Sequence, residues 1–342
     1  MEAHERRLPV YLVLDVSESM LDEGMDALQK GLTALMMDLH GDAQALETAW
    51  VSVITFADRA EQVVPLTELA RVRIPPLHCR PGTALGAALT LLTDCIAREV
   101  RTQSARVKGD WKPLVFLLTD GMPTDDWEPA AARLRGMAGR HPANVVAIAC
   151  GAEVDPYVLM QVSGNVLMMH DDPDGFRQLF QWISSSVTLT SRAVANPDPG
   201  PVALQTLPEG VAPATASAAP RRRGTRVPVL FLPFRCGRTR RPYLVRYRLR
   251  DQLDGYEPLR AHRVDEAYMA AAGGSDAALG LSSEEVFGVP DCPYCGTGGA
   301  GRCPCGGLLC ADREGGPAVC PWCGSTLRFA GGGPFGLSGR MG

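Results

Sequence analysis

Residues 9–19 read PVYLVLDVSES, and this stretch decides the fold class. Its first six residues are continuously apolar, which is typical of a β-strand that is buried on both faces of a sheet. The next five residues place Asp15, Ser17 and Ser19 on one side of an extended loop, because alternate residues of extended backbone point the same way. We therefore expect a buried strand that ends in a group of oxygen-bearing side chains.

Segments with strand-like and helix-like patterns alternate from this point as far as residue 190. Further strands are predicted at 50–56, 62–66, 114–118, 144–150 and 166–169. Helical spacing of apolar residues predicts helices at 23–40, 84–100, 127–138 and 174–187. This alternation favours an α/β fold with a mostly parallel sheet and helices on both faces. Such sheets carry their binding sites at the carboxyl ends of the strands.

Two further polar residues fall at the same predicted edge of the sheet. Asp120 follows the strand LVFLL, and Thr83 lies in the loop just before the long helix. Two carboxylates and three hydroxyls would form a site of hard oxygen ligands, as Mg²⁺ prefers, with Mn²⁺ or Ca²⁺ as alternatives. An incomplete shell would leave room for an Asp or Glu from a partner protein. The alternative is that Ser17, Ser19 and Thr83 serve only as helix caps and turn residues.

The segments DVSES, GT before the long helix and LLTDG resemble the metal-ion-dependent adhesion site of von Willebrand factor A domains. The resemblance implies a Rossmann-like α/β domain. It also implies that Ser17, Ser19 and Thr83 coordinate the ion through hydroxyls, and that Asp15 and Asp120 bind it directly or through water.

The longer segments around these motifs are similar to one group of von Willebrand factor A proteins. LPVYLVLDVSESM and GDWKPLVFLLTDGMPTDDW resemble the TerY proteins of bacterial tellurite-resistance and stress gene clusters. This resemblance implies a cytoplasmic, non-enzymatic protein-interaction scaffold. It also implies association with a protein kinase and a PP2C-type phosphatase, and no membrane partner.

Cysteines are concentrated near the C-terminus, where eight of the eleven lie beyond residue 230. The N-terminus has no signal-peptide pattern, so metal binding is a better interpretation than disulfides. Two C-P-x-C-G knuckles are typical of a zinc ribbon and predict one closed site, formed by Cys292, Cys295, Cys320 and Cys323. The remaining thiols can form a second zinc site, from Cys236, Cys303, Cys305 and Cys310. Cys303 and Cys305 are one residue apart, which makes them a poor ligand pair along a strand.

Composition divides the chain into a first domain at 1–190, a linker, a second domain and a tail. Residues 191–226 lack periodicity and are rich in Pro and Ala, which predicts a semi-rigid linker. Residues 227–330 are expected to form a small β-rich, zinc-ribbon-type domain that resembles the TerY C-terminal module. The Gly-rich tail 331–342 is expected to be disordered.

The distribution of charge raises an alternative function. The net charge is -4, yet residues 221–250 hold eleven arginines and no acid, so a nucleic-acid-binding zinc-ribbon protein is the alternative. A strand at 243–249 would place Arg246, Arg248 and Arg250 on one face. We favour a solvated face or a protein interface over nucleic-acid binding. Arginine is the usual basic residue of this sequence, which has only three lysines.

Several other classes of protein are excluded by what the sequence lacks. No apolar run reaches about 18 residues, as a membrane-spanning helix requires. The phosphate-loop, nucleophile-elbow and zinc-protease motifs are absent, so we expect no enzyme activity. A subunit of an ATP-driven metal chelatase would have a long acidic linker, whereas this linker ends in basic residues. Asp125 and Glu128 fit a capping box at the start of the helix near 127–138.

Overall fold

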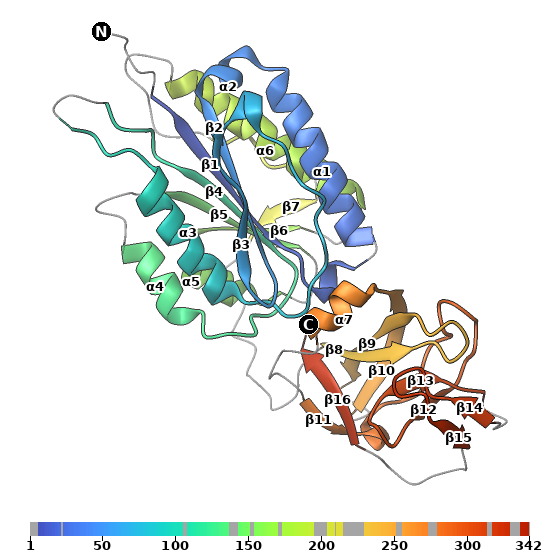
Figure 1. Ribbon diagram of the computed structural model, residues 1–342. Coiled ribbons are helices and arrows are strands. Elements are labelled where there is room, and N and C mark those ends of the chain that lie inside the picture. The colour runs from blue at the N-terminus through green and yellow to red at the C-terminus, as the bar shows by residue number, and fades with distance from the viewer. Residues whose placement is uncertain are drawn as a thin grey trace. The chain divides into compact units, whose positions relative to one another are not determined.

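The computed structural model describes residues 6–21, 23–104, 108–136, 143–150, 154–169, 173–194, 204–208, 210–214, 229–250, 255–272, 279–312, 317–328 and 336–341. The chain divides into a first unit of residues 1–79 and 83–221 and a second unit of residues 80–82 and 222–342. Each unit has its own main sheet, as Figure 1 shows. Separate apolar clusters pack in each unit.

The first unit is built on a seven-stranded sheet with the strand order β3-β2-β1-β4-β5-β6-β7. Its strands are β1 (Leu8–Asp15), β2 (Ala49–Phe56), β3 (Ala60–Glu68), β4 (Leu114–Thr119), β5 (Asn144–Cys150), β6 (Asn165–Met169) and β7 (Val211–Pro213). The five central strands, β2, β1, β4, β5 and β6, are parallel to one another. The edge strands β3 and β7 are antiparallel to their neighbours. The predicted mostly parallel sheet is therefore confirmed.

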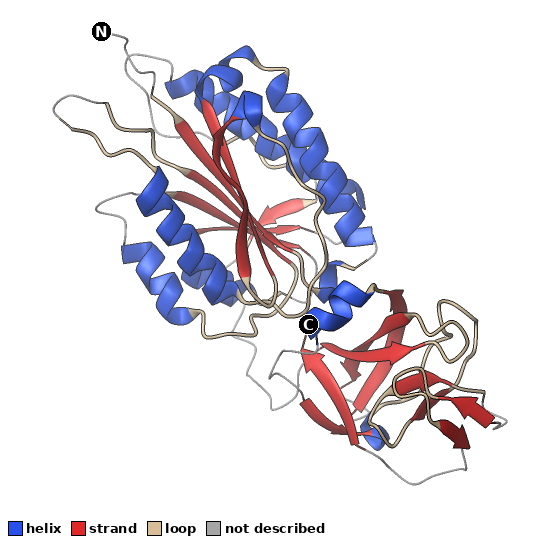
Figure 2. Cartoon of the chain, in the orientation of Figure 1, coloured by secondary structure: helices blue, strands red, loops and turns tan. Residues whose placement is uncertain are grey.

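Helices cover both faces of this sheet (Figure 2). One face carries α1 (Glu23–His40), α2 (Ala43–Thr48) and α6 (Pro173–Val194). The other carries α3 (Leu85–Glu99), α4 (Glu128–Gly136) and α5 (Pro156–Val162). Successive residues of β1 enter opposite cores, with Leu12 on the α1 side and Val13 on the α3 side, which explains its continuous apolar run. Among the described helices, none combines the length and the apolar character needed to cross a membrane.

The first unit extends into the segment predicted to be a linker, 191–226. Helix α6 continues to Val194, and β7 pairs with β6. Trp182 donates a hydrogen bond from Nε1 to the carbonyl oxygen of Gln205 at 3.0 Å. Apolar residues of the segment also pack against the core, at Leu204, Leu207 and Val211. The linker prediction is wrong for these described residues, because a few apolar anchors are enough to dock a Pro/Ala-rich segment.

The second unit is β-rich, as predicted. Its main sheet has the order β10-β9-β8-β13-β12, and β16 pairs with both β8 and β11. The strands of this sheet are β8 (Val229–Arg235), β9 (Pro242–Arg250), β10 (Gly255–Arg263), β11 (Leu279–Ser282), β12 (Ala300–Arg302), β13 (Leu308–Cys310) and β16 (Gly336–Met341). A separate hairpin of β14 (Pro317–Val319) and β15 (Thr326–Arg328) and a helix, α7 (Glu266–Ala272), belong to the same unit.

The end of the chain is also more ordered than its composition predicts. Residues 336–341 form β16, which is antiparallel to β11 and to β8, and Leu337 is buried in the apolar core of the unit. The prediction of a disordered tail is therefore wrong for β16. Two neighbouring strands supply its backbone partners, so a Gly-rich segment with one buried apolar anchor can complete the sheet.

Candidate metal centres

The carboxyl end of β1 continues into the loop that carries three of the predicted ligands. Asp15 is the last residue of β1, and Ser17 and Ser19 follow at the start of a short 3-10 helix, Glu18–Met20. The parallel pairing of β1 with β4 sets Leu14 opposite Leu118, so the residues after both strands emerge at the same edge. Asp15 and Ser17 are buried there.

Short hydrogen bonds join four of the five predicted ligands. Asp15 Oδ1 accepts from the backbone N–H of Ser17 at 2.9 Å, and Ser17 Oγ lies 2.8 Å from Ser19 Oγ. Ser19 Oγ in turn donates to Asp120 Oδ1 at 2.6 Å. The structure thus brings these four oxygen-bearing side chains together, although they come from loops about 100 residues apart in sequence.

Thr83 completes the group and provides a test of whether the residues fit a cation. A side chain built at Gly121 would lie 3.0 Å from Thr83 Oγ1 and 3.5 Å from Ser19 Oγ, so both hydroxyls lie beside the Gly121 backbone. Thr83 is only 1% exposed, and its Oγ1 has no hydrogen-bond partner among the described residues. An unpaired buried hydroxyl costs about 1–3 kcal/mol, which coordination to a metal ion would offset. The five residues therefore fit a divalent cation.

The electrostatics of Asp15 agree with this fit. Burial raises the pKa of Asp15 to about 6, against the hydrogen bonds from Ser17 and Thr119 that lower it. Thr119 Oγ1 donates to Asp15 Oδ2 at 2.6 Å, so Thr119 orients this carboxylate from β4. Sequence reasoning missed Thr119, although it stands directly before Asp120 in LLTDG. A nearby positive charge would favour the ionised form that burial disfavours.

Asp125 has a different role from the one predicted. Its carboxylate accepts hydrogen bonds from the backbone of the preceding helix α3, and α4 begins only at Glu128. The contacts are made to Gly86 and Ala87 in the first turn of that helix. The loop after β4 is therefore tied to the loop that carries Thr83.

The eight C-terminal cysteines form two groups of four, each with ligand atoms within 4.8 Å of one another. We name the first group cluster A, which consists of Cys236, Cys292, Cys295 and Cys310. The second group is cluster B, which consists of Cys303, Cys305, Cys320 and Cys323. Four thiolates at this spacing can hold one tetrahedral Zn²⁺, so the second unit has two zinc-type centres.

The predicted pairing of the two knuckles with each other is wrong. The first knuckle combines instead with the turn after β8 and with the end of β13, and Cys295 Sγ lies 3.6 Å from Cys310 Sγ. Parallel pairing of β13 with β8 decides this arrangement, because it brings Cys310 to the turn that carries Cys236. The N–H of Gly237 lies 3.2 Å from Cys310 Sγ at the same place.

The second knuckle combines with Cys303 and Cys305, the pair expected to be poor ligands. Cys303 Sγ lies 3.6 Å from Cys323 Sγ, and Cys305 Sγ lies 3.8 Å from Cys320 Sγ. The pair lies in a tight turn and not along a strand. Gly306 adopts a φ of 93° there and donates its N–H to the carbonyl oxygen of Cys303 at 2.8 Å. This turn lets two thiols that are one residue apart serve one centre.

The two clusters differ in exposure. Cluster A is almost wholly buried, whereas Cys305 and Cys323 of cluster B are exposed. Hydrogen bonding to Ser325 lowers the pKa of Cys323 to about 6, which favours the thiolate form of this one ligand.

Both units match known families. Residues 10–122 match the von Willebrand factor type A domain, and residues 227–338 match the TerY-C metal binding domain. Together they match a TerY-type protein. This TerY-type combination indicates a metal-binding interaction role.

Similar folds occur in solved structures. Proximal thread matrix protein 1 from the mussel byssus is 20% identical over 54% of this chain and 46% of its own, with a TM-score of 0.40. That mussel protein has also been solved with zinc in its adhesion-site motif. A von Willebrand factor type A protein from Catenulispora acidiphila is 18% identical over 54% of this chain and 43% of its own, with a TM-score of 0.42. The chain thus spans less than half of either relative. Among curated proteins, none matches the sequence.

Proposed function

We propose that the protein is a non-enzymatic scaffold whose first unit captures a partner protein through Mg²⁺, with Mn²⁺ or Ca²⁺ as substitutes. The observation that carries the proposal is the buried hydroxyl of Thr83, which lacks a hydrogen-bond partner among the described residues and lies, like that of Ser19, next to the Gly121 backbone. Asp15 and Asp120 supply the negative charge of the site. Ser17, Ser19 and Thr83 supply neutral oxygen donors.

The donor set accounts for how a partner would be recognised. Three of the five donors are neutral hydroxyls, so the protein neutralises the ion less completely than an all-carboxylate site would. A bound ion supplies a positive centre that attracts an acidic side chain. We infer that the partner contributes an Asp or Glu to this site.

The partners are proposed from the TerY-type domain combination. We infer a protein kinase and a PP2C-type phosphatase, in a bacterial tellurite-resistance or stress-response complex in the cytoplasm. The match of both units to the domains of a TerY-type protein supports this proposal. Zinc in clusters A and B would hold the second unit folded as a further docking module.

The test is a binding measurement on the full chain with purified candidate kinase and phosphatase. We expect binding in the presence of Mg²⁺ and its loss after brief EDTA treatment. Binding should return with excess Mg²⁺, while the zinc content stays constant. The metal ion should exchange faster at the oxygen site than at the four-thiolate centres, because the coordination shell of the oxygen site is open. Changing the partner's acid to its amide should weaken binding about as much as Asp15→Ala. Equal binding in Mg²⁺ and EDTA would contradict the proposal.

Three described arginines of the basic segment 221–250 are paired with carboxylates, which weakens the nucleic-acid alternative. Arg248 and Arg250 lie 3.4 Å and 2.7 Å from Glu257 carboxylate oxygens, and Arg235 lies 2.6 Å from Glu266. These carboxylates lower the local positive charge that phosphate binding would require. Residues 221–228 of the basic segment lie outside the described part of the chain.

A further inference from the structure

We propose that Asp125 is a positioning residue of the oxygen site, which it controls by holding helix α3 and the Thr83 loop in place. The inference rests on the proposed function, since it concerns the same metal site. Asp125 itself is not a ligand in this account. It acts through Thr83, which precedes the helix by two residues.

The first observation is that α3 depends on Asp125 for its N-terminal cap. The residue at the cap position is Ala84, which has no side-chain oxygen and makes no cap hydrogen bond. The free N–H groups of the first turn need acceptors, and Asp125 supplies them from a different loop. Its Oδ1 accepts from Gly86 at 3.0 Å, and its Oδ2 accepts from Ala87 at 2.9 Å. A carboxylate at this end also complements the helix dipole.

The second observation is that the neighbouring residue binds Thr83 directly. The N–H of Thr83 donates to Thr124 Oγ1 at 3.0 Å, and the N–H of Thr124 donates to the carbonyl oxygen of Thr83 at 3.0 Å. Thr124 therefore forms two hydrogen bonds with Thr83, and Asp125 forms two with the first turn of α3. Asp120, a predicted ligand, belongs to the same loop after β4.

The third observation is the close approach of the first turn of α3 to the loop after β4. A side chain at Gly86 would lie 2.6 Å from the carbonyl oxygen of Asp126 and 2.9 Å from Trp127 Cα. Only glycine permits this separation without movement of the backbone. Trp127 is buried in the same apolar cluster as α3, and this burial anchors the loop after β4. The loop after β4 is therefore packed directly against the first turn of α3, and Asp125 is the charged residue at this contact.

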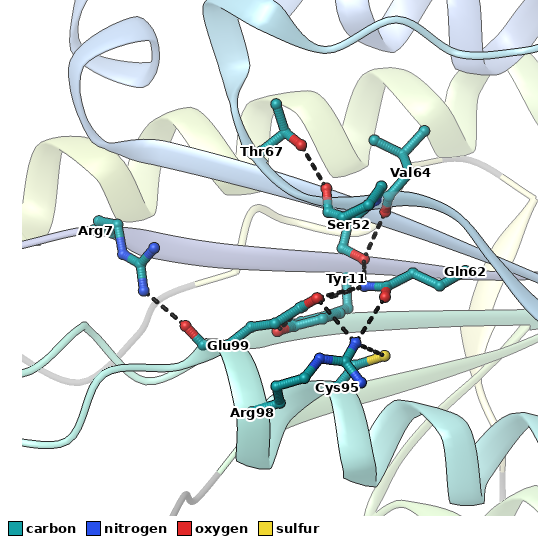
Figure 3. A network of polar contacts seen from close by, with 10 residues as sticks. Arg7, Tyr11, Ser52, Gln62, Val64, Thr67, Cys95, Arg98 and Glu99 are labelled. Carbon is teal, nitrogen blue, oxygen red and sulfur yellow. Dashed lines mark hydrogen bonds and ion pairs between the residues drawn. The ribbon is translucent and has the colours of Figure 1, made fainter.

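The fourth observation is that α3 is also held at its far end (Figure 3). Glu99 accepts hydrogen bonds from Tyr11 Oη at 3.1 Å and from Gln62 Nε2 at 2.9 Å, and it pairs with Arg98 at 3.2 Å. Loss of Asp125 would therefore free the N-terminal turn of α3 and not displace the whole helix. That turn is the part joined to Thr83.

The experiment titrates the full chain with Mg²⁺ alone and measures the dissociation constant by calorimetry. Asp125→Ala is expected to raise it about 10- to 100-fold, the usual effect of removing a residue that orients a metal ligand. Asp125→Asn should fall between Asp125→Ala and the wild type, because an amide oxygen can still accept one of the two hydrogen bonds. Asp126→Ala is the matched control, an exposed neighbour whose change should leave the constant within about twofold.

A second control separates positioning from general stability. Glu99→Gln should lower the melting temperature, because it weakens the anchor at the far end of α3, yet leave the Mg²⁺ dissociation constant unchanged. A wild type that does not bind Mg²⁺ would overturn the proposed function as well as this inference. A wild type that binds, with Asp125→Ala within twofold of it, would overturn this inference alone. If Asp125→Ala does not fold, Asp125→Asn decides in the same way.

Discussion

The oxygen site of the first unit and the cysteine clusters of the second unit differ in how each is joined to its core. The oxygen ligands lie on loops at the edge of a sheet that two large apolar clusters already support. In the second unit, three thiols of cluster A are themselves members of the apolar core, namely Cys236, Cys292 and Cys310. A metal that sits on a finished core can exchange without unfolding it, whereas a metal inside a small core supplies part of its folding free energy.

The clusters of the second unit repeat this contrast on a smaller scale. Cluster B belongs to a small apolar group that includes Cys303, Leu309, Cys320 and Leu327. Its knuckle forms the turn between β14 and β15, a hairpin that pairs with no other described strand. Cluster A therefore supports the main sheet of the unit, and cluster B joins a peripheral hairpin to the turn between β12 and β13 of that sheet.

The largest expected effect comes from breaking cluster A. Cys310→Ser should lose one of two zinc ions and unfold the main sheet of the second unit, because the thiol belongs to the core and joins β13 to the Cys236 turn. Metal analysis gives the zinc content, and hydrogen exchange of β8 and β9 gives the extent of unfolding. A variant with full protection of both strands would contradict the structural role of cluster A.

The next largest effect is loss of Mg²⁺ binding without loss of fold. Asp15→Ala should abolish binding, since a buried carboxylate in contact with Ser17 is removed, while the circular dichroism spectrum stays that of the wild type. The melting temperature in EDTA should not fall by more than a few degrees, because burial disfavours the ionised carboxyl. Collapse of the first unit in this variant would show that the oxygen site is structural, like cluster A.

A smaller, local effect is expected from cluster B. Cys305→Ser should also lose one zinc, yet exchange protection should fall only in residues 317–328 and the turn at Cys303, because Cys305 is exposed and outside the main core. This variant is the matched partner of Cys310→Ser, with the same chemical change and the same lost zinc. If both variants unfold the unit equally, the distinction between the clusters is wrong.

The smallest effect is on pH dependence. Because the folded-state pKa of Asp15 is raised to about 6 from an ordinary value of 3.8, this carboxyl should contribute most to the stability of the metal-free first unit at low pH. This contribution is lost as pH rises through about 6. Mg²⁺ affinity should change in the opposite direction and fall by roughly tenfold per unit of pH below that value, as a proton competes for the carboxylate. Thermal melts and Mg²⁺ titrations across this range test both signs, and Asp15→Asn should remove the stability trend.

Local patterns determined the parts of the fold in which neighbouring residues carry the signal. The continuous apolar run before Asp15 and the apolar run LVFLL before Thr119 predicted buried parallel strands, and the loops that follow parallel strands lie at one edge of the sheet. The convergence of Asp15, Ser17, Ser19, Thr83 and Asp120 could therefore be predicted from the sequence. The short helices α2 and α5 were not predicted, because six or seven residues hold too little periodicity to be recognised.

Only the tertiary structure decided which distant segments meet. The knuckle spacing predicted thiol pairs at Cys292 and Cys320, but the register of β13 beside β8 decided that each pair takes different partners. The sequence around Asp125 predicts that it caps the helix that follows it. In the structure, the loop that carries Asp125 packs against Gly86, so Asp125 caps α3. β7 and β16 are strands because existing sheets offer them unpaired backbone, although their own composition predicts none. Composition and spacing report what a residue can do, and contacts between segments far apart in sequence determine which of those options is used.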